Sequence, residues 1–344
     1  MAMTLLGVRA DVKVVSFGIS HYPTDSEWCE LNAQNDQNLL RETFPGAVTL
    51  LDKGATYRGI KSELSSLGGR TQPGDTLIIH FSGHGQQILT QNSKMEPDCV
   101  DESFVAYDAE MHRSDTYHGE HHLVDDELGE IVGGLRRKVG PKGLVMVVID
   151  ACHSNSMDRL EGENTKENTY RGTSYIFGSE ELSPRDIEEL REKAYREDTE
   201  PISTDPVMSN VVYISACQSH ERNYEIKVDG KGYGGLTYYF CRMVREKGLQ
   251  DVGRLLTAIY EGMANDKSLK FHGQLPAIRN SIGWEAPTRT KEKAVIEEKC
   301  DEPESEGMTP EEMKKWGTVI LGILIGFGLI GLLFWAIHRA TKDK

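Results

Sequence analysis

Two side chains that could act together in catalysis each follow an apolar run of the sequence. His84 lies at the end of TLIIHFSGHG (76–85), and Cys152 lies near the end of LVMVVIDACHS (144–154). A cysteine thiolate is a strong nucleophile, and a neighbouring imidazole lowers the pKa of the thiol and later protonates the leaving amine. The backbone N–H groups of Gly85 and Cys152 are candidate donors to the oxyanion that such an attack creates. The pair therefore indicates nucleophilic thiol catalysis.

Each of these residues also has an ordinary structural interpretation when it is taken alone. A cysteine after an apolar strand is more often a small buried hydrophobic residue, and a histidine before a glycine is more often a turn residue. Their joint occurrence after two apolar runs favours the catalytic interpretation. Cys217, in ISACQ, also follows an apolar run and is the alternative nucleophile.

Apolar runs and helical patterns alternate along the chain, and these elements must position the two side chains. The predicted strands are 12–20, 48–52, 76–85, 144–154 and 211–218. The predicted helices are 30–43, 56–67, 123–138, 235–247 and 251–265. Such alternation is typical of a parallel α/β sheet with helices on both faces. Sites in these sheets form at the carboxyl ends of the strands, where His84 and Cys152 are expected.

Two regions depart from this alternation. Residues 155–209 are polar, with one predicted helix at 183–198, and they indicate a functional loop or a linker. Residues 286–315 combine three prolines with many acidic residues, which is typical of a solvated stalk. The compact domain is therefore expected to span residues 1–285.

Composition excludes several classes of protein. The 344 residues include 39 Lys and Arg against 54 Asp and Glu, and the resulting net charge of −15 argues against a nucleic-acid partner. Six cysteines are too few for a disulfide scaffold of this length. The mean hydropathy of −0.46 argues against a polytopic membrane protein.

The C-terminal region differs from this average. No charged residue occurs from 317 to 337, and about 20 apolar residues suffice for a helix to cross a bilayer. We therefore predict a single transmembrane helix at 316–338, followed by a basic tail at 339–344. The N-terminus lacks the pattern of a secretory signal, so we expect a C-terminal anchor with the catalytic domain on the cytosolic side of the membrane.

Several sequence blocks resemble those of one family. SGHGQQ (82–87) and DACHS (150–154) resemble the His–Cys blocks of the caspase-like cysteine proteases, and in particular those of the metacaspases. Further blocks of the chain are similar to metacaspase blocks in the same order: ELNAQND (30–36), PDCVDESFVAYD (97–108), LVDDEL (123–128), ISACQ (214–218) and GYGGLTYYF (232–240). The resemblance covers about residues 12–283.

The resemblance implies a caspase-hemoglobinase fold, an α/β three-layer sandwich around a mostly parallel six-stranded sheet. It implies a cysteine endopeptidase with His84 and Cys152 as the catalytic dyad. It also implies a pocket for the residue before the cleaved bond, formed by Asp36, Ser82 and Asp150. Acidic groups there suit an Arg or Lys side chain, and bidentate geometry favours Arg. A helix-surface role for Asp36 and a structural hydrogen bond for Asp150 are the alternatives.

Metacaspases often depend on calcium, so the resemblance also implies a regulatory Ca²⁺ site. Its candidate ligands are all carboxylates, which Ca²⁺ prefers: Asp98, Asp101, Asp125, Asp126 and Asp158. The acids at 125–127 also suit the N-terminus of a helix, where negative charge is favourable.

The segment 155–209 occupies the position at which caspase-like enzymes separate their large and small subunits. Its basic residues are expected to be exposed, and a protease specific for basic residues could cut there: Arg159, Lys166, Arg171, Arg185, Arg191, Lys193 and Arg196. We therefore predict autocatalytic processing of a zymogen within 155–209. The resemblance further suggests a monomer. Two alternatives stay open, namely a catalytically silent interaction module at a membrane and a caspase-like protease with another primary specificity.

Two further patterns are given structural interpretations. GKGYGG (230–235) contains G-x-G-x-x-G, but only a short polar run precedes it, so we expect no dinucleotide site. A solvated loop is favoured over a transition-metal site for a cluster of histidines and acids: His118, His121, His122, Asp125 and Asp126.

Overall fold

The computed structural model describes residues 10–89, 100–152, 169–194, 202, 204–218 and 221–287. One compact unit spans Met1–Pro287, and a second spans Thr288–Lys344. The predicted transmembrane helix, the basic tail and nearly all of the predicted stalk lie outside the described residues. Within the described ranges, no helix combines the length and the apolar character needed to cross a membrane.

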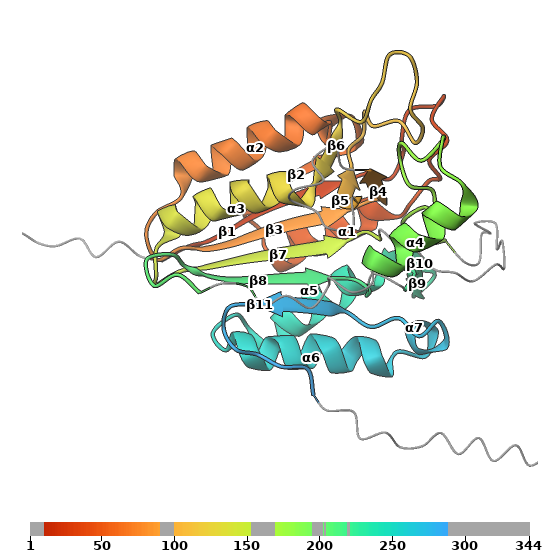
Figure 1. Ribbon diagram of the computed structural model, residues 1–344. Coiled ribbons are helices and arrows are strands. Elements are labelled where there is room, and N and C mark those ends of the chain that lie inside the picture. Colours follow the sequence, from red (N-terminus) through yellow and green to blue (C-terminus); the bar gives the residue numbers. More distant parts are fainter. Residues whose placement is uncertain are drawn as a thin grey trace, which may run out of the picture. The chain divides into compact units, whose positions relative to one another are not determined.

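A six-stranded sheet forms the centre of the first unit (Figure 1). Its strands, in spatial order, are β11 (Ala277–Asn280), β8 (Asn210–Ser215), β7 (Leu144–Asp150), β3 (Thr76–Ser82), β1 (Val12–Gly18) and β2 (Val48–Leu51). Neighbouring strands run parallel except for β11, which pairs antiparallel with β8. The prediction of a mostly parallel six-stranded sheet is confirmed.

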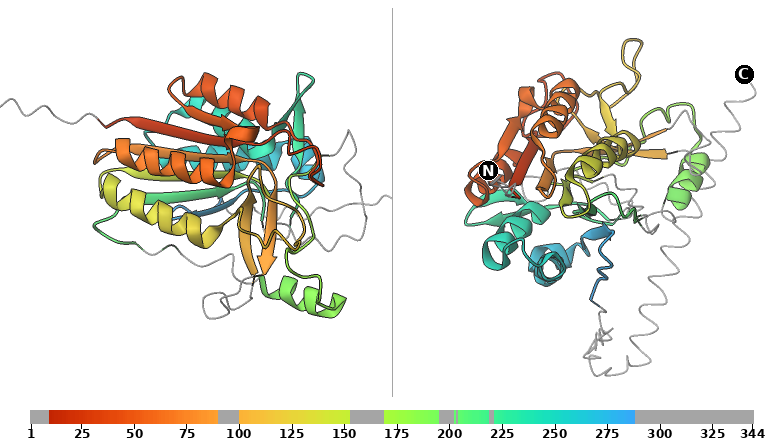
Figure 2. Two further views of the ribbon diagram at one scale, coloured as in Figure 1. Left: turned by 90° about the horizontal axis from the view of Figure 1, so that it is seen from above. Right: turned by 90° about the vertical axis from the view of Figure 1, so that its left-hand side faces the viewer.

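Helices cover both faces of this sheet, as the alternating sequence pattern predicted. Helices α2 (Tyr57–Arg70) and α3 (Asp125–Val139) lie on one face, and α1 (Ala33–Thr43), α5 (Gly235–Lys247) and α6 (Val252–Asn265) belong to the other (Figures 1 and 2). Successive side chains of a strand point to opposite faces. In β3, Leu77, Ile79 and Phe81 therefore pack toward α2 and α3, whereas Ile78 packs toward α1 and α5.

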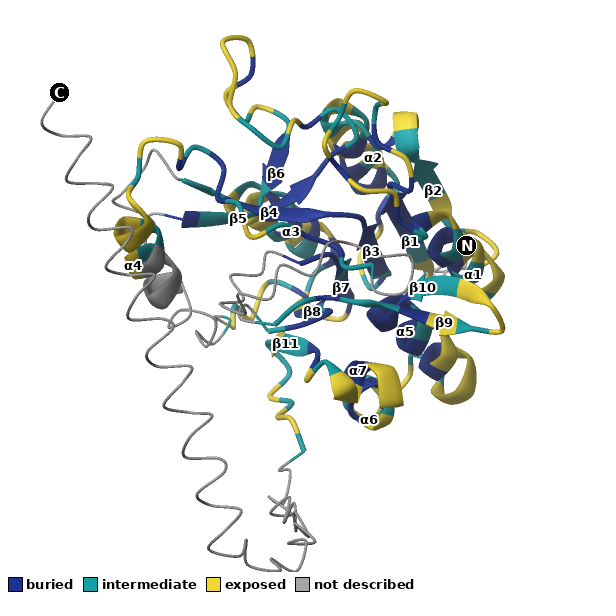
Figure 3. Cartoon of the chain, turned by 90° about the vertical axis from the view of Figure 1, so that its right-hand side faces the viewer, coloured by how far each residue is buried: buried dark blue, intermediate teal, exposed yellow. Residues whose placement is uncertain are grey.

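Smaller elements surround the carboxyl ends of the central strands. Strands β4 (Gly85–Leu89), β5 (Val100–Val105) and β6 (His122–Val124) form a three-stranded antiparallel sheet, and β9 (Glu225–Val228) and β10 (Lys231–Gly234) form a hairpin. The described elements are completed by the 3-10 helix η1 (Asp52–Gly54) and by helices α4 (Pro184–Ala194) and α7 (Lys267–Phe271). Burial is greatest in the central strands, while exposed residues predominate on the described part of α4 (Figure 3).

Two expectations about polar segments are wrong. Residues 155–209 were expected to form a polar loop or linker outside the core, yet Ile176 and Phe177 are each only 2% exposed, and Phe177 packs into the main core. His122 was expected in a solvated loop, but it is buried on β6, where its ring nitrogens lie 2.9 Å from the Tyr117 hydroxyl and 2.8 Å from Gln86 Oε1. Contacts with other elements bury these residues, and the local sequence does not reveal such contacts.

The buried imidazole of His122 leads to a prediction about stability. Burial lowers the pKa of His122 to about 4, so the folded state keeps the ring neutral at pH values where the unfolded chain takes up a proton. The stabilising effect of the neutral ring is complete above pH 6.5 and is lost as the pH falls toward 4. Between pH 7 and 5, we expect the parent chain to lose about 2 kcal/mol more unfolding free energy than His122→Gln. Urea titrations at both pH values, in a Cys152→Ala background, measure this difference, and equal losses would contradict it.

Candidate active site

The register of the central sheet brings the two candidate catalytic residues to one edge. Strands β3 and β7 pair in parallel, with Ser82 opposite Asp150. His84 and Cys152 each follow their strand by two residues, and both are buried, with 1% of each exposed. Neighbouring parallel strands lie about 4.8 Å apart, so the two residues leave the sheet side by side.

His84 is oriented by a backbone carbonyl and by aromatic rings. Its Nε2 lies 2.9 Å from the carbonyl oxygen of Cys29, and its ring stacks on Trp28 at 5.1 Å between centroids. Donation from Nε2–H to this carbonyl leaves Nδ1 as the basic nitrogen. Nδ1 is buried and has no hydrogen-bond partner among the described residues. Burial lowers the pKa of His84 to about 4, although the Cys29 carbonyl opposes this shift.

Cys29 enters this geometry through its backbone. It lies in the loop that precedes α1, which begins at Ala33. The loop leads its carbonyl to His84. Sequence reasoning missed this contact, because a backbone carbonyl carries no residue-type signal.

The segment after Cys152 returns to the same edge and presents a carbonyl group there. The carbonyl oxygen of Arg171 accepts hydrogen bonds from Cys152 N at 2.7 Å and from Gly85 N at 3.4 Å. These are the two N–H groups expected to face an oxyanion. The thiol of Cys152 donates to the carbonyl of Glu221 at 3.2 Å, and the Sγ atom of Cys217 lies 3.5 Å from Cys152 Sγ.

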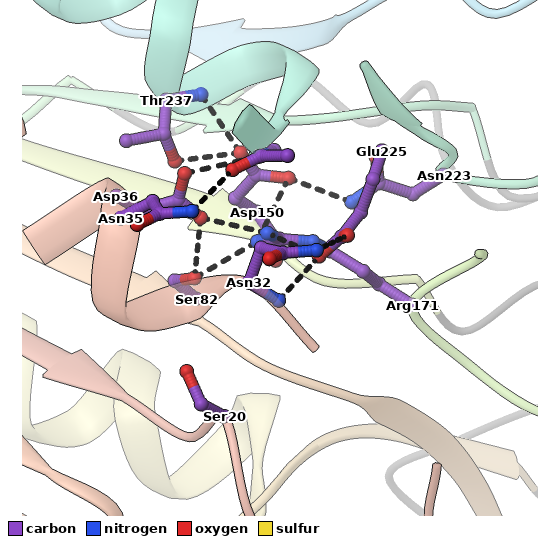
Figure 4. A network of polar contacts seen from close by, with 12 residues as sticks. Ser20, Asn32, Asn35, Asp36, Ser82, Asp150, Arg171, Asn223, Glu225 and Thr237 are labelled. Carbon is purple, nitrogen blue, oxygen red and sulfur yellow. Dashed lines mark hydrogen bonds and ion pairs between the residues drawn. The ribbon is translucent and has the colours of Figure 1, made fainter. Parts of the chain in front are cut away.

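The side chain of Arg171 lies in the predicted acidic pocket (Figure 4). Its Nη2 donates to Asp36 at 2.7 Å and to Glu225 at 2.9 Å. Its Nη1 donates to Ser82 at 2.8 Å and lies 3.6 Å from a carboxylate oxygen of Asp150. Arg171 is 0% exposed, so the expectation that it is an exposed basic residue of the 155–209 segment is wrong. Its polar partners come from α1, β3, β7 and β9, which the local sequence around Arg171 could not indicate.

Each pocket carboxylate is held by hydrogen bonds of its own. Asp36 accepts from Gly234 N at 3.0 Å, and Asp150 accepts from Thr237 N at 2.7 Å, in the first turn of α5. Positive charge at a helix N-terminus stabilises such an anion. A Cβ atom at Gly234 would lie 2.1 Å from Asp150 Oδ2, so this position requires glycine. The pocket is therefore preorganised rather than formed by mobile surface acids.

The buried charges shift one another's protonation. Burial raises the pKa of Asp36 to about 7, although the Arg171 guanidinium opposes this shift. Burial lowers the pKa of Arg171, but the carboxylates of Asp36, Asp150 and Glu225 outweigh this effect and raise it above its usual value. The pocket therefore favours a permanently charged guanidinium over neutral side chains.

On both sides of the Arg171–Gly172 bond, the chain pairs with neighbouring segments through isolated β-bridges. Upstream, Arg171 N donates to the carbonyl of Asn223 at 2.9 Å, and Glu225 N donates to the carbonyl of Thr169 at 2.9 Å. Downstream, Phe177 N donates to the carbonyl of Gln87 on β4 at 2.8 Å. A Cβ atom at Gly172 would lie 2.3 Å from the carbonyl oxygen of Cys152, so the chain passes directly over the cysteine. This is how a peptide substrate would lie against strand-like partners.

Sequence reasoning placed several residues that the structure brings together, and it missed others. Asp36, Ser82 and Asp150 surround one guanidinium, that of Arg171, while Gly85 and Cys152 share one carbonyl. Glu225 was missed because it begins the strand EIKV, whose polar composition suggests an exposed edge. Its Oε1 accepts from Asn32 N at 2.8 Å, which directs the carboxylate into the pocket.

The candidate calcium ligands are only partly described. Asp98 and Asp158 lie outside the described residues. Asp125 and Asp126 begin α3, and Asp101 lies on β5. The antiparallel register of β5 and β6 places Ser103 opposite Val124, so all three acids lie toward one end of that sheet. Over the described part of the chain, no group of three or more His, Cys, Asp or Glu side chains is arranged to hold a metal ion.

Comparisons with known proteins show which family the chain belongs to. The model of the caspase domain family matches residues 12–286. Metacaspase-2 of Arabidopsis thaliana is 28% identical over 239 residues, which cover 64% of this chain and 51% of that protein. Metacaspase-1 of Schizosaccharomyces pombe is 24% identical over 299 residues, which cover 77% and 66%. Metacaspase-4 of Arabidopsis thaliana is 26% identical over 130 residues, which cover 38% and 28%.

The fold also has a counterpart among solved structures. The crystal structure of protein GSU0716 from Geobacter sulfurreducens superposes with a TM-score of 0.50 at 22% identity, covering 79% of this chain and 93% of that one. The chain spans between 28% and 66% of the length of the three metacaspases. The family match extends over most of the chain and includes every strand of the central sheet. The chain therefore belongs to the caspase domain family.

Proposed function

We propose that this chain is a cysteine endopeptidase that cleaves after arginine, and after lysine more slowly. One observation carries the proposal: a single residue, Arg171, has its carbonyl oxygen on two backbone N–H groups and its side chain among three carboxylates. The N–H groups around the carbonyl oxygen suit an attack by Cys152 on the carbonyl carbon. The carboxylates around the side chain suit the recognition of a positively charged substrate residue.

The proposed mechanism uses the groups that surround this carbonyl. Nδ1 of His84 accepts the thiol proton of Cys152, and the thiolate attacks the carbonyl carbon. The N–H groups of Gly85 and Cys152 stabilise the oxyanion, and His84 returns the proton to the leaving amine. Water then hydrolyses the thioester, with His84 as general base. The Cys29 carbonyl holds the ring in the orientation that leaves Nδ1 basic.

Peptide substrates with a fluorogenic leaving group test this function. Substrates that differ only in the residue before the cleaved bond should rank Arg above Lys, with Asp not cleaved. The two Nη atoms of Arg171 contact different acceptors, and a lysine ammonium cannot reproduce this fork. Turnover that persists in Cys152→Ala, or an Asp preference, would contradict the proposal. No turnover of any substrate would support a silent interaction module instead.

The pocket acids give a prediction for specificity. Asp36→Asn removes the charge nearest Nη2 while keeping the size of the side chain. We expect kcat/KM for Arg substrates to fall about a hundredfold, because a charge-assisted contact is lost in a buried pocket. Steady-state kinetics with the Arg peptide measure this effect. Asp115→Asn, the same change in an exposed loop, is the matched control and should leave kcat/KM unchanged. An equal effect of both substitutions would exclude the pocket role.

We further propose that the enzyme processes itself at the bond between Arg171 and Gly172. Among the described basic residues of 155–209, Arg171 is the one whose carbonyl lies on the N–H groups of Gly85 and Cys152. Arg159, Lys166 and Arg196 lie outside the described residues. The exposed Arg185, on α4, has no such contact. Support for this assignment comes from the backbone hydrogen bonds and isolated β-bridges on both sides of the bond, which are contacts that a bound peptide substrate would make.

Calcium stimulation and membrane tethering are also proposed. Asp101, Asp125 and Asp126 offer hard oxygen donors near one end of a sheet, but the described residues alone do not complete a site, so no step of the mechanism involves calcium. Assays with and without a chelator test the stimulation. The uncharged segment 317–337 supports the tether, and extraction of membranes with alkaline carbonate tests it. Release of the chain into the carbonate supernatant would contradict the tether.

A further inference from the structure

A second thiol lies beside the candidate nucleophile and has no part in the proposed mechanism. Cys217 Sγ is 3.5 Å from Cys152 Sγ, and both residues are buried. The carbonyl of Arg171 takes its hydrogen bonds from Cys152 and Gly85, not from Cys217. Cys217, the alternative nucleophile of the sequence, is thus a neighbour of the attacking thiol rather than its replacement.

The paired strands bring the two cysteines to the same edge of the sheet. Strands β7 and β8 are parallel neighbours with Ile149 opposite Ser215, and Ala216 N donates to the carbonyl of Ile149 at 3.0 Å. Cys152 and Cys217 follow these paired residues by three and two positions. Adjacent strands lie about 4.8 Å apart, and disulfides join Cα atoms roughly 4.4 to 6.8 Å apart. Small rotations of the two side chains would therefore close the bond.

The chemistry of the two thiols differs in a way that suits them to successive roles. The contact with Cys152, together with burial, raises the pKa of Cys217 well above its usual value, so Cys217 stays a protonated thiol. A thiolate at Cys152, which the peptidase mechanism requires, is also the form that reacts with peroxides. One sulfur is thus suited to be oxidised first, and the other is in place to react with the product.

We propose that Cys152 and Cys217 are a redox modification site, at which a peroxide converts the two thiols into a disulfide that reversibly blocks the nucleophile. The Cys152 thiolate attacks one peroxide oxygen, the O–O bond breaks, and the released hydroxide takes a proton to become water. The Cys217 sulfur then attacks the resulting sulfenic acid, the S–O bond breaks, and a second water leaves with the Cys217 proton. Two thiols thereby reduce one peroxide molecule to two waters, and a dithiol reverses the bond by exchange.

The chain's own segment controls access to this pair. Gly172 passes over Cys152, and only 1% of Cys152 is exposed while Arg171 occupies the pocket. The disulfide itself does not depend on peptidase activity, whereas the resulting inhibition rests on the proposed function. The test therefore measures the covalent bond and the activity separately, before and after self-cleavage.

Peptide mapping of the full chain tests the proposal. The protein is treated with hydrogen peroxide, blocked with N-ethylmaleimide and digested without reduction. Mass spectrometry should detect a linked peptide pair containing Cys152 and Cys217, with the loss of two hydrogen atoms. Its absence both before and after self-cleavage would overturn the proposal. If the pair forms in a chain that never hydrolyses peptides, the proposed function fails while the redox site stands.

Substitution of the second thiol sharpens this test. In Cys217→Ala, sulfenic acid at Cys152 lacks the thiol that lies 3.5 Å away in the parent chain and should proceed to sulfinic acid, a gain of two oxygen atoms that dithiothreitol does not reverse. Dithiothreitol should restore peptide hydrolysis by at least about tenfold in oxidised wild type and not in this variant. Cys241→Ala, the same change at a buried cysteine on α5, is the matched control and should behave as wild type. Equal recovery of activity in Cys217→Ala and wild type would overturn the proposal.

Discussion

Replacing Cys152 with alanine should abolish peptide hydrolysis and self-cleavage together. Loss of the attacking thiol is expected to lower kcat about ten-thousand-fold, because binding and the oxyanion donors alone supply only a small part of the rate. Removing one buried sulfur should change the fold little, since the backbone hydrogen bonds from residue 152 N to the Arg171 carbonyl and from Arg171 N to the Asn223 carbonyl remain. Activity on an Arg peptide and the fragment pattern on a denaturing gel measure the two effects.

Control variants separate catalysis from general damage to the site. Cys217→Ala removes the neighbouring sulfur, which the mechanism does not use, and should keep most of the activity under reducing conditions. Thermal unfolding of both variants checks that the fold is intact. Peptide hydrolysis by Cys152→Ala, or its loss in Cys217→Ala with the fold preserved, would identify Cys217 as the nucleophile.

Replacing Arg171 with glutamine should prevent self-cleavage and also destabilise the unprocessed chain. The guanidinium lies among the carboxylates of Asp36, Asp150 and Glu225, all of them buried. Removing one partner of a buried ion pair costs about 3–5 kcal/mol, because the remaining charges lose their counterion. Urea unfolding in a Cys152→Ala background measures the stability without interference from cleavage, and gel analysis in the active chain measures the processing.

Two further variants show whether these effects depend on the position of the arginine and on its guanidinium group. Arg185→Gln makes the same change on the exposed surface of α4 and should alter neither processing nor stability by a measurable amount, because its ion pair with Glu189 is exposed. Arg171→Lys keeps the charge but loses the fork of donors, so cleavage should continue about tenfold more slowly. Normal processing of Arg171→Gln would show that another bond is cut.

The sequence predicted the long central strands and the helices that cover them better than the short strands at the edges. Long apolar runs such as 144–154 identify buried parallel strands, because both of their faces must be covered. Strand β11 was missed because AIRN is only four residues long and partly exposed, and β4 was hidden in a segment of glycines and glutamines. Pairing with a neighbouring strand, rather than local propensity, makes these segments strands.

In the candidate site, too, the positions that depend on local sequence could be predicted, whereas those that depend on contacts with distant residues could not. His84 and Cys152 follow strong strands, so their common edge could be predicted from the sheet alone. Asp36 entered only through the family resemblance, because nothing around it in the sequence points to a pocket. The buried position of Arg171 depends on contacts with residues up to 135 positions away, and these act against the usual exposure of arginine in a polar segment.

The identity of the bond that the chain cuts in itself tests the central claim most directly. The wild-type chain is purified and left to process, and the fragments are characterised by intact mass and N-terminal sequencing, with Cys152→Ala treated in parallel. The occupied pocket predicts one fragment that ends at Arg171 and another that begins at Gly172, and neither fragment in the variant. Fragments that leave the Arg171–Gly172 bond intact, or the same fragments in Cys152→Ala, would contradict the account.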